Sequence, residues 1–300
     1  MTDHTSGGDM AAKLLEGKIV AEAVLQDVAK EVAKLKEKGI TPGLGTILVG
    51  EDGPSISYVN KKHETCKAVG IESFHAGIPA DATQQDLLNA VQDFNDNPDV
   101  DAFIIQYPLP KGFDFNEALL KMTPEKDADG LHPVNLGRLV LQEPGPVPCT
   151  PAGIQAMLKH YEIPVAGREV VIVGRGPTLG RPLSLILTLK QPFANAVVTI
   201  VHSAVKNISD YTRRADIVIA AVGRPGIITP DMVKPGAVVI SGGITWEGKR
   251  LVPDVDESVA EVAGWITPRL GGVGPTTVAM LLLNTVKAAK HRNPSPTQQG

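Results

Sequence analysis

Three polar side chains of different chemistry occur at short spacing early in the chain. Ser55 precedes Tyr58 by three positions, and Lys62 follows Tyr58 by four. On a helix these spacings place a hydroxyl, an aromatic ring and an amine on one face. A lysine held in an apolar pocket loses its charge more easily and becomes usable as a base. The pattern indicates one wall of a catalytic pocket, although a solvated helix face carrying Lys61 and Lys62 explains it equally well.

Further polar residues follow at the end of a strand and in a loop. Gln106 comes directly after the apolar run 100–105, which is typical of a buried strand. Parallel sheets bind ligands outside the carboxyl ends of their strands, so Gln106 is a candidate binding residue. Asp127 and Asp129 lie in the loop sequence KDADG, where a carboxylate suits the paired N–H donors of a heterocycle. For Asp127 we expect instead a carboxylate that stabilises the turn before Gly130.

A glycine-rich turn follows a second apolar strand, residues 169–173. Gly174, Gly176 and Gly180 form the pattern G-x-G-x-x-x-G, one residue longer than the common dinucleotide fingerprint. Glycine lets the backbone approach a phosphate, and the helix that follows presents free N–H groups and a partial positive charge. The turn predicts a nucleotide site, with a tight strand-to-helix connection as the alternative.

The next strand, residues 197–201, distinguishes between the two nicotinamide cofactors. It ends in His202 and Ser203, whereas an NAD site has Asp or Glu about 20 residues after the turn to hold the ribose hydroxyls. Arg175 in the turn suits a 2′-phosphate. NADP is therefore the expected cofactor, and the alternatives are a solvated Arg175 and a His202 that caps the strand end.

Helix-like and strand-like segments alternate along the chain, and this predicts an α/β fold of parallel strands joined by right-handed crossovers. A proline-rich stretch, residues 143–148, separates two α/β halves. Ser55 is the expected N-cap of its helix, and the last helix is expected to return to the first half. Helices are expected at 17–38, 55–69, 83–94, 151–161 and 276–290, and strands at 44–49, 71–78, 100–105, 169–173, 197–201, 217–222 and 238–241.

Composition narrows the class of protein. A length of 300 residues suggests two domains, and a net charge of -4 argues against a chain that coats nucleic acid or an acidic membrane. Cys66 and Cys149, the only cysteines, do not form a metal cluster or a disulfide framework, and the histidines have no metal-ligand spacing. No apolar run approaches the ~18 residues of a membrane span, and the first residues do not resemble a signal peptide. We expect a cytoplasmic protein with no metal and no nucleic-acid or membrane partner.

Five segments, in a fixed order, carry a resemblance to a known family. They are SISYVNKKHETCKAVGI, FIIQYPLP, PEKDADGLHPVNLGRL, VVIVGRGPTLGRPLSLIL and GGVGPTTVAMLLLNT. From about residue 17 to 290 the chain resembles the bifunctional methylenetetrahydrofolate dehydrogenase/methenyltetrahydrofolate cyclohydrolase family. The resemblance implies a homodimer of two α/β domains with a cleft between them. Residues 1–148 with the helix 276–292 would form a folate-binding catalytic domain, 149–275 a Rossmann-type NADP-binding domain, and 293–300 a flexible tail.

The resemblance also implies roles for individual residues. Tyr58 would stack on the folate, Lys62 would be catalytic, and Gln106 would position that lysine. Asp129 would hold the pterin ring, and further folate contacts would come from Ser55, Gly272 and Pro275. The implied cofactor contacts are Gly174, Arg175, Gly176, Ser203 and Ile244. Many family members have serine at the position of Gly176, so this chain lacks one hydroxyl that can hold the 2′-phosphate. The expected preference for NADP over NAD is therefore smaller than in those members.

The implied activity joins two reactions of one-carbon metabolism. NADP-dependent oxidation of 5,10-methylenetetrahydrofolate gives 5,10-methenyltetrahydrofolate, and hydrolysis then gives 10-formyltetrahydrofolate for purine biosynthesis. Two alternatives belong to other classes. A shikimate dehydrogenase-like NADP oxidoreductase would need a Lys–Asp pair for proton transfer, and a nucleotide-binding protein without activity would have no reason to keep Tyr58, Lys62, Gln106 and Asp129.

Overall fold

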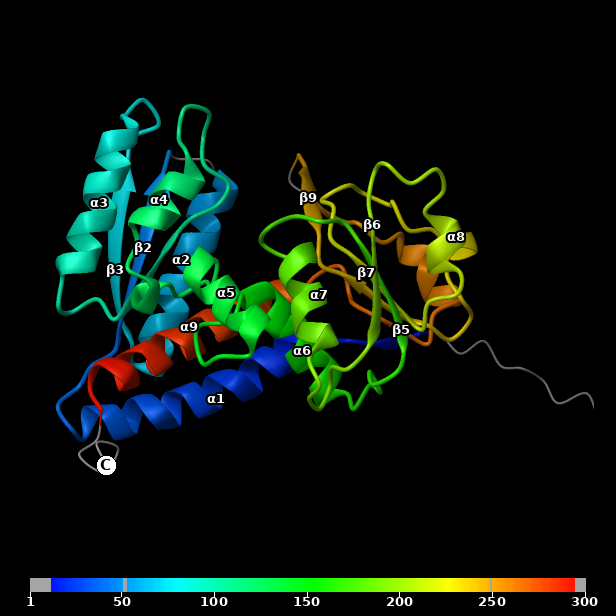
Figure 1. Ribbon diagram of the computed structural model, residues 1–300, viewed down its shortest axis with the longest axis horizontal. Coiled ribbons are helices and arrows are strands. Elements are labelled where there is room, and N and C mark those ends of the chain that lie inside the picture. Colours follow the sequence, from blue (N-terminus) through cyan, green and yellow to red (C-terminus); the bar gives the residue numbers. More distant parts are fainter. Residues whose placement is uncertain (1–11, 51–52, 249, 295–300) are drawn as a thin grey trace, which may run out of the picture. The chain divides into compact units, whose positions relative to one another are not determined.

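The computed structural model describes residues 12–50, 53–248 and 250–294, and these form two compact α/β units (Figure 1). Unit 1 comprises the described residues up to Val20 together with Gly153–Thr276. Unit 2 comprises Ala21–Ala152 and the described residues from Thr277 onward. The chain passes from one unit to the other within three helices, which are α1 (Gly17–Lys36), α6 (Cys149–His160) and α9 (Val273–Arg292). The predicted α/β fold with two units is confirmed.

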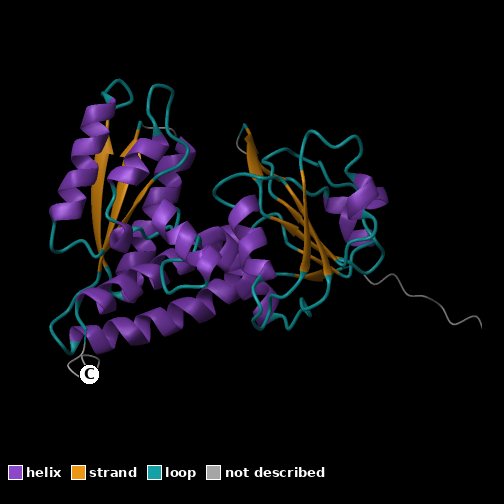
Figure 2. Cartoon of the chain, in the orientation of Figure 1, coloured by secondary structure: helices purple, strands orange, loops and turns teal. Residues whose placement is uncertain are grey.

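Unit 2 is built on a three-stranded parallel sheet in the order β3-β2-β4. The strands are β2 (Gly43–Val49), β3 (Glu72–Ile78) and β4 (Ala102–Ile105), and helices α2 (Gly53–Val69) and α3 (Gln84–Asp96) follow β2 and β3 in the chain. Figure 2 shows helices lying beside the strands of this unit. Alternate strand residues point to opposite faces, so Ile47 and Phe103 share a core with Val91 of α3. Shorter helices, α4 (Phe115–Lys121) and α5 (Pro133–Leu141), come after β4.

Unit 1 contains a six-stranded sheet in the order β1-β11-β8-β7-β5-β6, and all its pairings are parallel. Its strands are β1 (Lys13–Leu14), β5 (Glu169–Val173), β6 (Val197–Val201), β7 (Ile217–Ala220), β8 (Val238–Ser241) and β11 (Trp265–Ile266). Ile172 packs with Leu158 of α6 and Leu183 of α7 (Gly180–Thr188), whereas Val171 packs with Val259 in a separate core. Both faces of the central strands are therefore covered, which explains their continuous apolar sequences.

Several boundaries differ from those expected. Helix α2 begins at Gly53, so Ser55 lies inside its first turns and the prediction of an N-cap there is wrong. Helix α9 begins at Val273, so part of the expected turn GGVGP is helical and includes Pro275. Proline is well tolerated in a first helical turn, because the N–H that it lacks would have no partner there.

The first described residues belong to unit 1, whereas the expected domain ranges placed them with the catalytic half. Strand β1 adds to the sheet beside β11, and Leu15 N donates to Ile266 O at 2.8 Å. Two-residue strands such as β1 and β11 are too short to show a period in the sequence. The antiparallel hairpin of β9 (Ile244–Glu247) and β10 (Arg250–Pro253) was also not foreseen.

The register of the sheet in unit 1 places four strand ends in one row. Val173 at the end of β5 pairs with Val201 of β6 and with Ala220 of β7, and Ala220 pairs with Ser241 of β8. The segments that follow these residues therefore all begin at the carboxyl edge of the sheet.

Within the described residues, no helix has both the length and the apolar character that crossing a membrane requires.

Candidate active site and cofactor edge

Lys62 is buried in the middle of α2, with 4% of its surface exposed. Its Nζ donates a hydrogen bond to Oε1 of Gln106 at 2.8 Å and lies 4.5 Å from the centre of the Tyr58 ring. Tyr58 and Lys62 thus share one helix face, as the spacing predicts. The alternative, a solvated helix face, holds for Lys61 but not for Lys62. Lys61 is exposed and forms an ion pair with Glu64 at 3.7 Å.

Gln106 follows β4 at its carboxyl end and holds its amide in one orientation. The backbone N–H of Gln106 donates to Ile47 O at 2.8 Å and extends the parallel ladder by one residue. Its side-chain Nε2 donates to Tyr107 O at 3.0 Å, which leaves Oε1 to accept from Lys62. A lysine that is held in this way presents its amine at a defined position.

Burial brings the ammonium group of Lys62 closer to neutrality, against the effect of the nearby negative charge. Burial lowers the pKa of Lys62 from the ordinary value of 10.5, and the negative charge of Asp129 opposes this shift. Burial and the charge of Asp127 raise the pKa of Asp129, while Lys62 opposes that rise. Burial also raises the pKa of the Tyr58 phenol, which therefore stays protonated. The site holds a lysine and a carboxyl group whose pKa values are displaced toward each other, as is common where protons are exchanged.

Asp127 has the structural role that the sequence predicts. Its side chain is buried and accepts hydrogen bonds from the N–H groups of Gly130 at 2.9 Å and His132 at 2.7 Å. The side-chain amide of Asn135 donates a third bond at 2.9 Å. With these bonds Asp127 shapes the loop that carries Asp129.

Sequence reasoning missed two polar residues of α9 that support the site. Asn284 is buried, and its Nδ2 donates to the carbonyl oxygens of Ala128 and Val147, each at 3.0 Å. Thr277 donates to Thr150 at 3.2 Å and is hydrogen-bonded to Tyr58, which limits the rise in the tyrosine's pKa. The available signal was the polar pair Asn284-Thr285 in the otherwise apolar run LLLNT.

Close packing explains two of the three glycines in the glycine-rich turn. Gly174 has a φ of +121°, and a Cβ there would lie 2.3 Å from Ala221 O. A Cβ at Gly180 would lie 2.3 Å from Gly174 O, so the helix start is pressed against the strand end. At Gly176 a Cβ would meet nothing within 4 Å. The turn therefore combines a tight strand-to-helix connection with an open surface at Gly176.

The other predicted cofactor residues lie at the same carboxyl edge. Arg175 is exposed, and its Nη1 lies 3.3 Å from Nε2 of His202, which follows β6. Ser203 is exposed beside it, and Ile244 at the start of β9 is 51% exposed. Ala204 N also lies 3.3 Å from His202 Nδ1, in agreement with a histidine that caps the strand end.

The remaining predicted folate residues belong to different parts of the chain. Gly272 follows β11 and packs tightly in unit 1, where a Cβ on Gly17 would lie 1.9 Å from Gly272 O. Pro275 lies in the first turn of α9, also in unit 1. Ser55 lies in α2, but its side chain is not among those described. Folate contacts of these three residues stay predictions.

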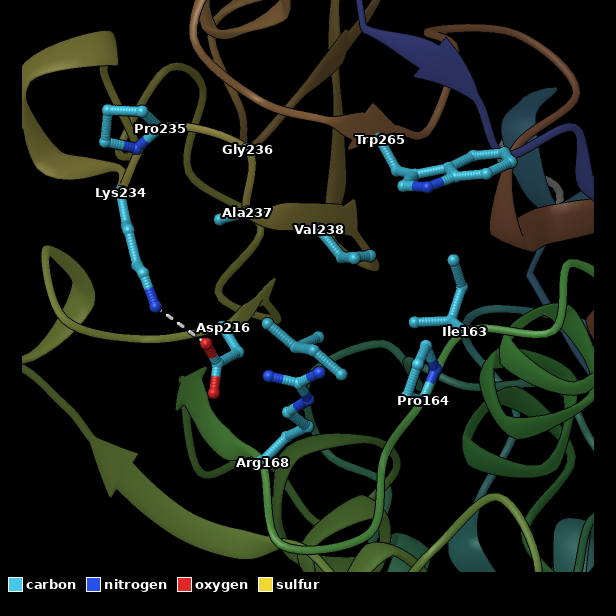
Figure 3. A pocket seen from close by; sticks show the side chains of 11 residues that line it. Ile163, Pro164, Arg168, Asp216, Lys234, Pro235, Gly236, Ala237, Val238 and Trp265 are labelled. Carbon is cyan, nitrogen blue, oxygen red and sulfur yellow. Dashed lines mark hydrogen bonds and ion pairs between the residues drawn. The ribbon is translucent and has the colours of Figure 1, made fainter.

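A cavity of about 250 Å³ lies at the opposite edge of the sheet in unit 1 (Figure 3). Its lining includes Arg168, Asp216 and Trp265, and Lys234 Nζ contacts Asp216 Oδ1 at 2.7 Å. These residues adjoin the amino ends of parallel strands, so the cavity is not part of the edge that carries the glycine-rich turn. Among the described residues, no cluster of His, Cys, Asp and Glu could hold a metal ion.

The fold and the two groups of residues define a class of protein. It is a two-unit α/β protein in which one unit has the parallel sheet and glycine-rich turn of dinucleotide-binding proteins, and the other carries a buried lysine. Family models agree with this division. Residues 15–129 match the catalytic domain of tetrahydrofolate dehydrogenase/cyclohydrolase, and residues 148–293 match the NAD(P)-binding domain of the same family. The chain belongs to the tetrahydrofolate dehydrogenase/cyclohydrolase family.

Individual relatives support the same assignment over nearly the whole chain. A bifunctional protein FolD from Syntrophotalea carbinolica is 79% identical over 283 residues, which cover 94% of this chain and 98% of that protein. The crystal structure of the bifunctional FolD enzyme from Campylobacter jejuni has a TM-score of 0.89 at 39% identity and covers 94% of this chain and 100% of its own. The Trypanosoma brucei enzyme, complexed with NADP and an inhibitor, has a TM-score of 0.89 at 38% identity and covers 95% of this chain and 99% of its own.

Proposed function

We propose that this protein oxidises 5,10-methylenetetrahydrofolate with NADP and hydrolyses the resulting 5,10-methenyltetrahydrofolate to 10-formyltetrahydrofolate. The observation that carries the proposal is the buried Lys62, held by Gln106 against the ring of Tyr58, in a chain whose two parts match the two domains of this family. The two alternatives from the sequence, a shikimate dehydrogenase-like enzyme and a protein without activity, have no comparable support.

The residues at the carboxyl edge of unit 1 fit a phosphorylated dinucleotide. The open surface at Gly176 lets the backbone approach a phosphate, and the exposed guanidinium of Arg175 and the exposed Ser203 offer donors to a 2′-phosphate. NADP would supply the acceptor for the hydride at this edge. Five residues would hold and orient it, namely Gly174, Arg175, Gly176, Ser203 and Ile244. The product is a resonance-stabilised cation, so this step removes no proton, and orientation accounts for most of the rate.

The hydrolytic step requires proton transfer, and Lys62 performs it. Water adds to the one-carbon bridge of the methenyl substrate, and the adduct opens to the formyl product after a proton moves from the new hydroxyl to the leaving nitrogen. The lowered pKa of Lys62 makes the neutral amine available as a base, and Gln106 positions it. Tyr58 stacks on the folate, and Asp129 accepts hydrogen bonds from its pterin ring. The folate contacts that the sequence predicts for Ser55, Gly272 and Pro275 belong to the same proposal.

Cyclohydrolase activity is expected to rise with pH as Lys62 loses its proton. Because burial lowers the pKa of Lys62 from 10.5, the activity should increase through an inflection below that value and level off once the amine is neutral. The profile is measured as the initial rate of methenyltetrahydrofolate loss at constant ionic strength. Rates of Lys62→Met give the uncatalysed background at each pH, and a flat profile after this correction would contradict a titrating lysine base.

A direct assay tests the proposed pair of reactions. Purified protein with 5,10-methylenetetrahydrofolate should reduce NADP and form first the methenyl and then the formyl product, with slower turnover when NAD replaces NADP. The two folate products are followed by their absorbance and by chromatography. Cofactor reduction without a formyl product would mean that the protein is a dehydrogenase only, and no reaction with either cofactor would reject the proposal.

Three further properties are proposed from the family assignment. We infer that the protein forms a homodimer, acts in the cytoplasm and supplies 10-formyltetrahydrofolate to purine biosynthesis. We also propose that residues 1–148 with 276–292 carry the folate chemistry and that residues 149–275 bind NADP. Strand β1 pairs with β11, and the described residues up to Val20 lie in unit 1.

A further inference from the structure

A buried carboxylate in unit 1, Asp254, has contacts that the reactions above do not use. Asp254 has no exposed surface. Its Oδ2 accepts hydrogen bonds from the N–H groups of Val222 at 2.7 Å and Gly223 at 3.0 Å, and its Oδ1 accepts from the N–H of Arg224 at 2.8 Å. Burial raises the pKa of Asp254, and these three bonds oppose that rise. A carboxylate with three backbone donors fixes the conformation of the segment that supplies them.

The same carboxylate leaves no room for a side chain on the neighbouring strand connection. A Cβ at Gly243 would lie 2.1 Å from Asp254 Oδ2 and 2.6 Å from Gly223 N. Two hydroxyls complete the network, since Thr245 Oγ1 donates to Gly223 O at 2.7 Å and Ser241 Oγ accepts from Asp254 N at 3.0 Å. Asp254 therefore joins the segment 222–224 to the segment 243–245.

Both segments lie at the carboxyl edge of the sheet. Residues 222–224 follow β7 and residues 243–245 follow β8, and the ends of β7 and β8 pair with each other. The first segment adjoins the glycine-rich turn, because a Cβ on Gly174 would lie 2.3 Å from Ala221 O. The second contains Ile244, one of the proposed cofactor contacts. Ile244 is exposed, whereas Asp254 is fully buried beneath the carboxyl edge and cannot itself touch a bound cofactor.

We propose that Asp254 is a positioning residue for the cofactor, which fixes the segments 222–224 and 243–245 in the shape that receives NADP. This inference rests on the proposed cofactor edge of unit 1. The carboxylate acts through the backbone that it binds, so its loss should affect cofactor affinity far more than the rate of hydride transfer at saturation. A carboxylate that only stabilised the domain would affect folding and leave the affinity of the folded protein unchanged.

The first test replaces Asp254 with asparagine, which keeps the size but turns one acceptor into an NH₂ group that faces backbone donors. In Asp254→Asn the KM for NADP and the Kd from equilibrium titration should rise about tenfold, because segments that have lost a hydrogen bond to a charged group must be ordered when NADP binds. The kcat at saturating NADP should fall by less than about twofold. Unchanged Kd and KM in a folded variant would overturn the proposal.

Asp216 provides a matched control in the same unit. Its carboxylate accepts a hydrogen bond from Glu169 N at 3.1 Å and forms an ion pair with Lys234. However, it lies at the opposite edge of the sheet, where it lines the cavity in Figure 3. Asp216→Asn should lower the thermal midpoint and leave the Kd for NADP unchanged. If both variants weaken NADP binding equally, Asp254 acts through general stability and the proposal is wrong.

A second variant keeps the test decisive if Asp254→Asn does not fold. Thr245→Val removes the hydroxyl that donates to Gly223 O in a solvent-accessible part of the network, and it should raise the Kd for NADP roughly threefold. Unchanged affinity in Thr245→Val would then overturn the proposal.

Arg175→Ala separates this inference from the assignment of the cofactor edge. If Arg175→Ala weakens NADP binding while the folded network variants do not, the edge is correct and the positioning role is wrong; if none of them weakens it, the edge itself is wrong.

Discussion

Replacement of Lys62 by methionine should abolish hydrolysis of 5,10-methenyltetrahydrofolate and leave the affinity for NADP unchanged. Methionine fills a similar volume, but it has no group that can transfer a proton. General acid–base catalysis contributes about 10² to 10⁴ in rate, so the remaining activity should be lower by that factor. The measurements are the initial rate with methenyltetrahydrofolate as the supplied substrate and the Kd for NADP from equilibrium titration.

The neighbouring lysine is the control for this substitution. Lys61 lies on the same helix, but it is exposed and pairs with Glu64, so Lys61→Met changes the charge of the protein equally without entering the site. Lys61→Met should keep full cyclohydrolase activity. Full turnover by Lys62→Met would refute the assigned role. If both variants lost activity equally, the charge of α2 would matter rather than the position of the amine.

Replacement of Arg175 by alanine should weaken NADP binding about 10- to 100-fold and change NAD binding little. Charge-assisted hydrogen bonds contribute roughly 1.5–3 kcal/mol, and Arg175 is exposed at the edge where a 2′-phosphate would lie. NAD lacks that phosphate, so it loses no such bond. The Kd values for both cofactors, measured at one fixed salt concentration, give the result as a ratio.

Arg168 offers a matched control for Arg175. It is also an exposed arginine of unit 1, but it lines the cavity at the amino ends of the strands. Arg168→Ala should leave both Kd values unchanged. An equal loss of NADP and NAD affinity in Arg175→Ala would mean that the guanidinium does not distinguish the cofactors, and His202 and Ser203 would become the next candidates for contacts to the 2′-phosphate.

The sequence by itself determined the elements that have strong local signals. Apolar runs located β2, β5 and β8 to within a residue or two, because strands covered on both faces are predominantly apolar. The loop role of Asp127 also followed from local chemistry, since an aspartate before a glycine satisfies backbone N–H groups within a few residues. Gly174 and Gly180 were recognisable because close backbone packing excludes larger residues.

Only the tertiary structure decided which polar residues work together. Lys61 and Lys62 are adjacent and chemically identical, yet the packing of α2 on its sheet buries one and exposes the other. Asn284 and Asp254 act through partners that are distant in the chain. The short strands β1 and β11 form by pairing in the sheet, β1 with β11 and β11 with β8, rather than from any local pattern. Burial and pairing of this kind depend on long-range contacts, whereas the local sequence records only the preferences of each segment.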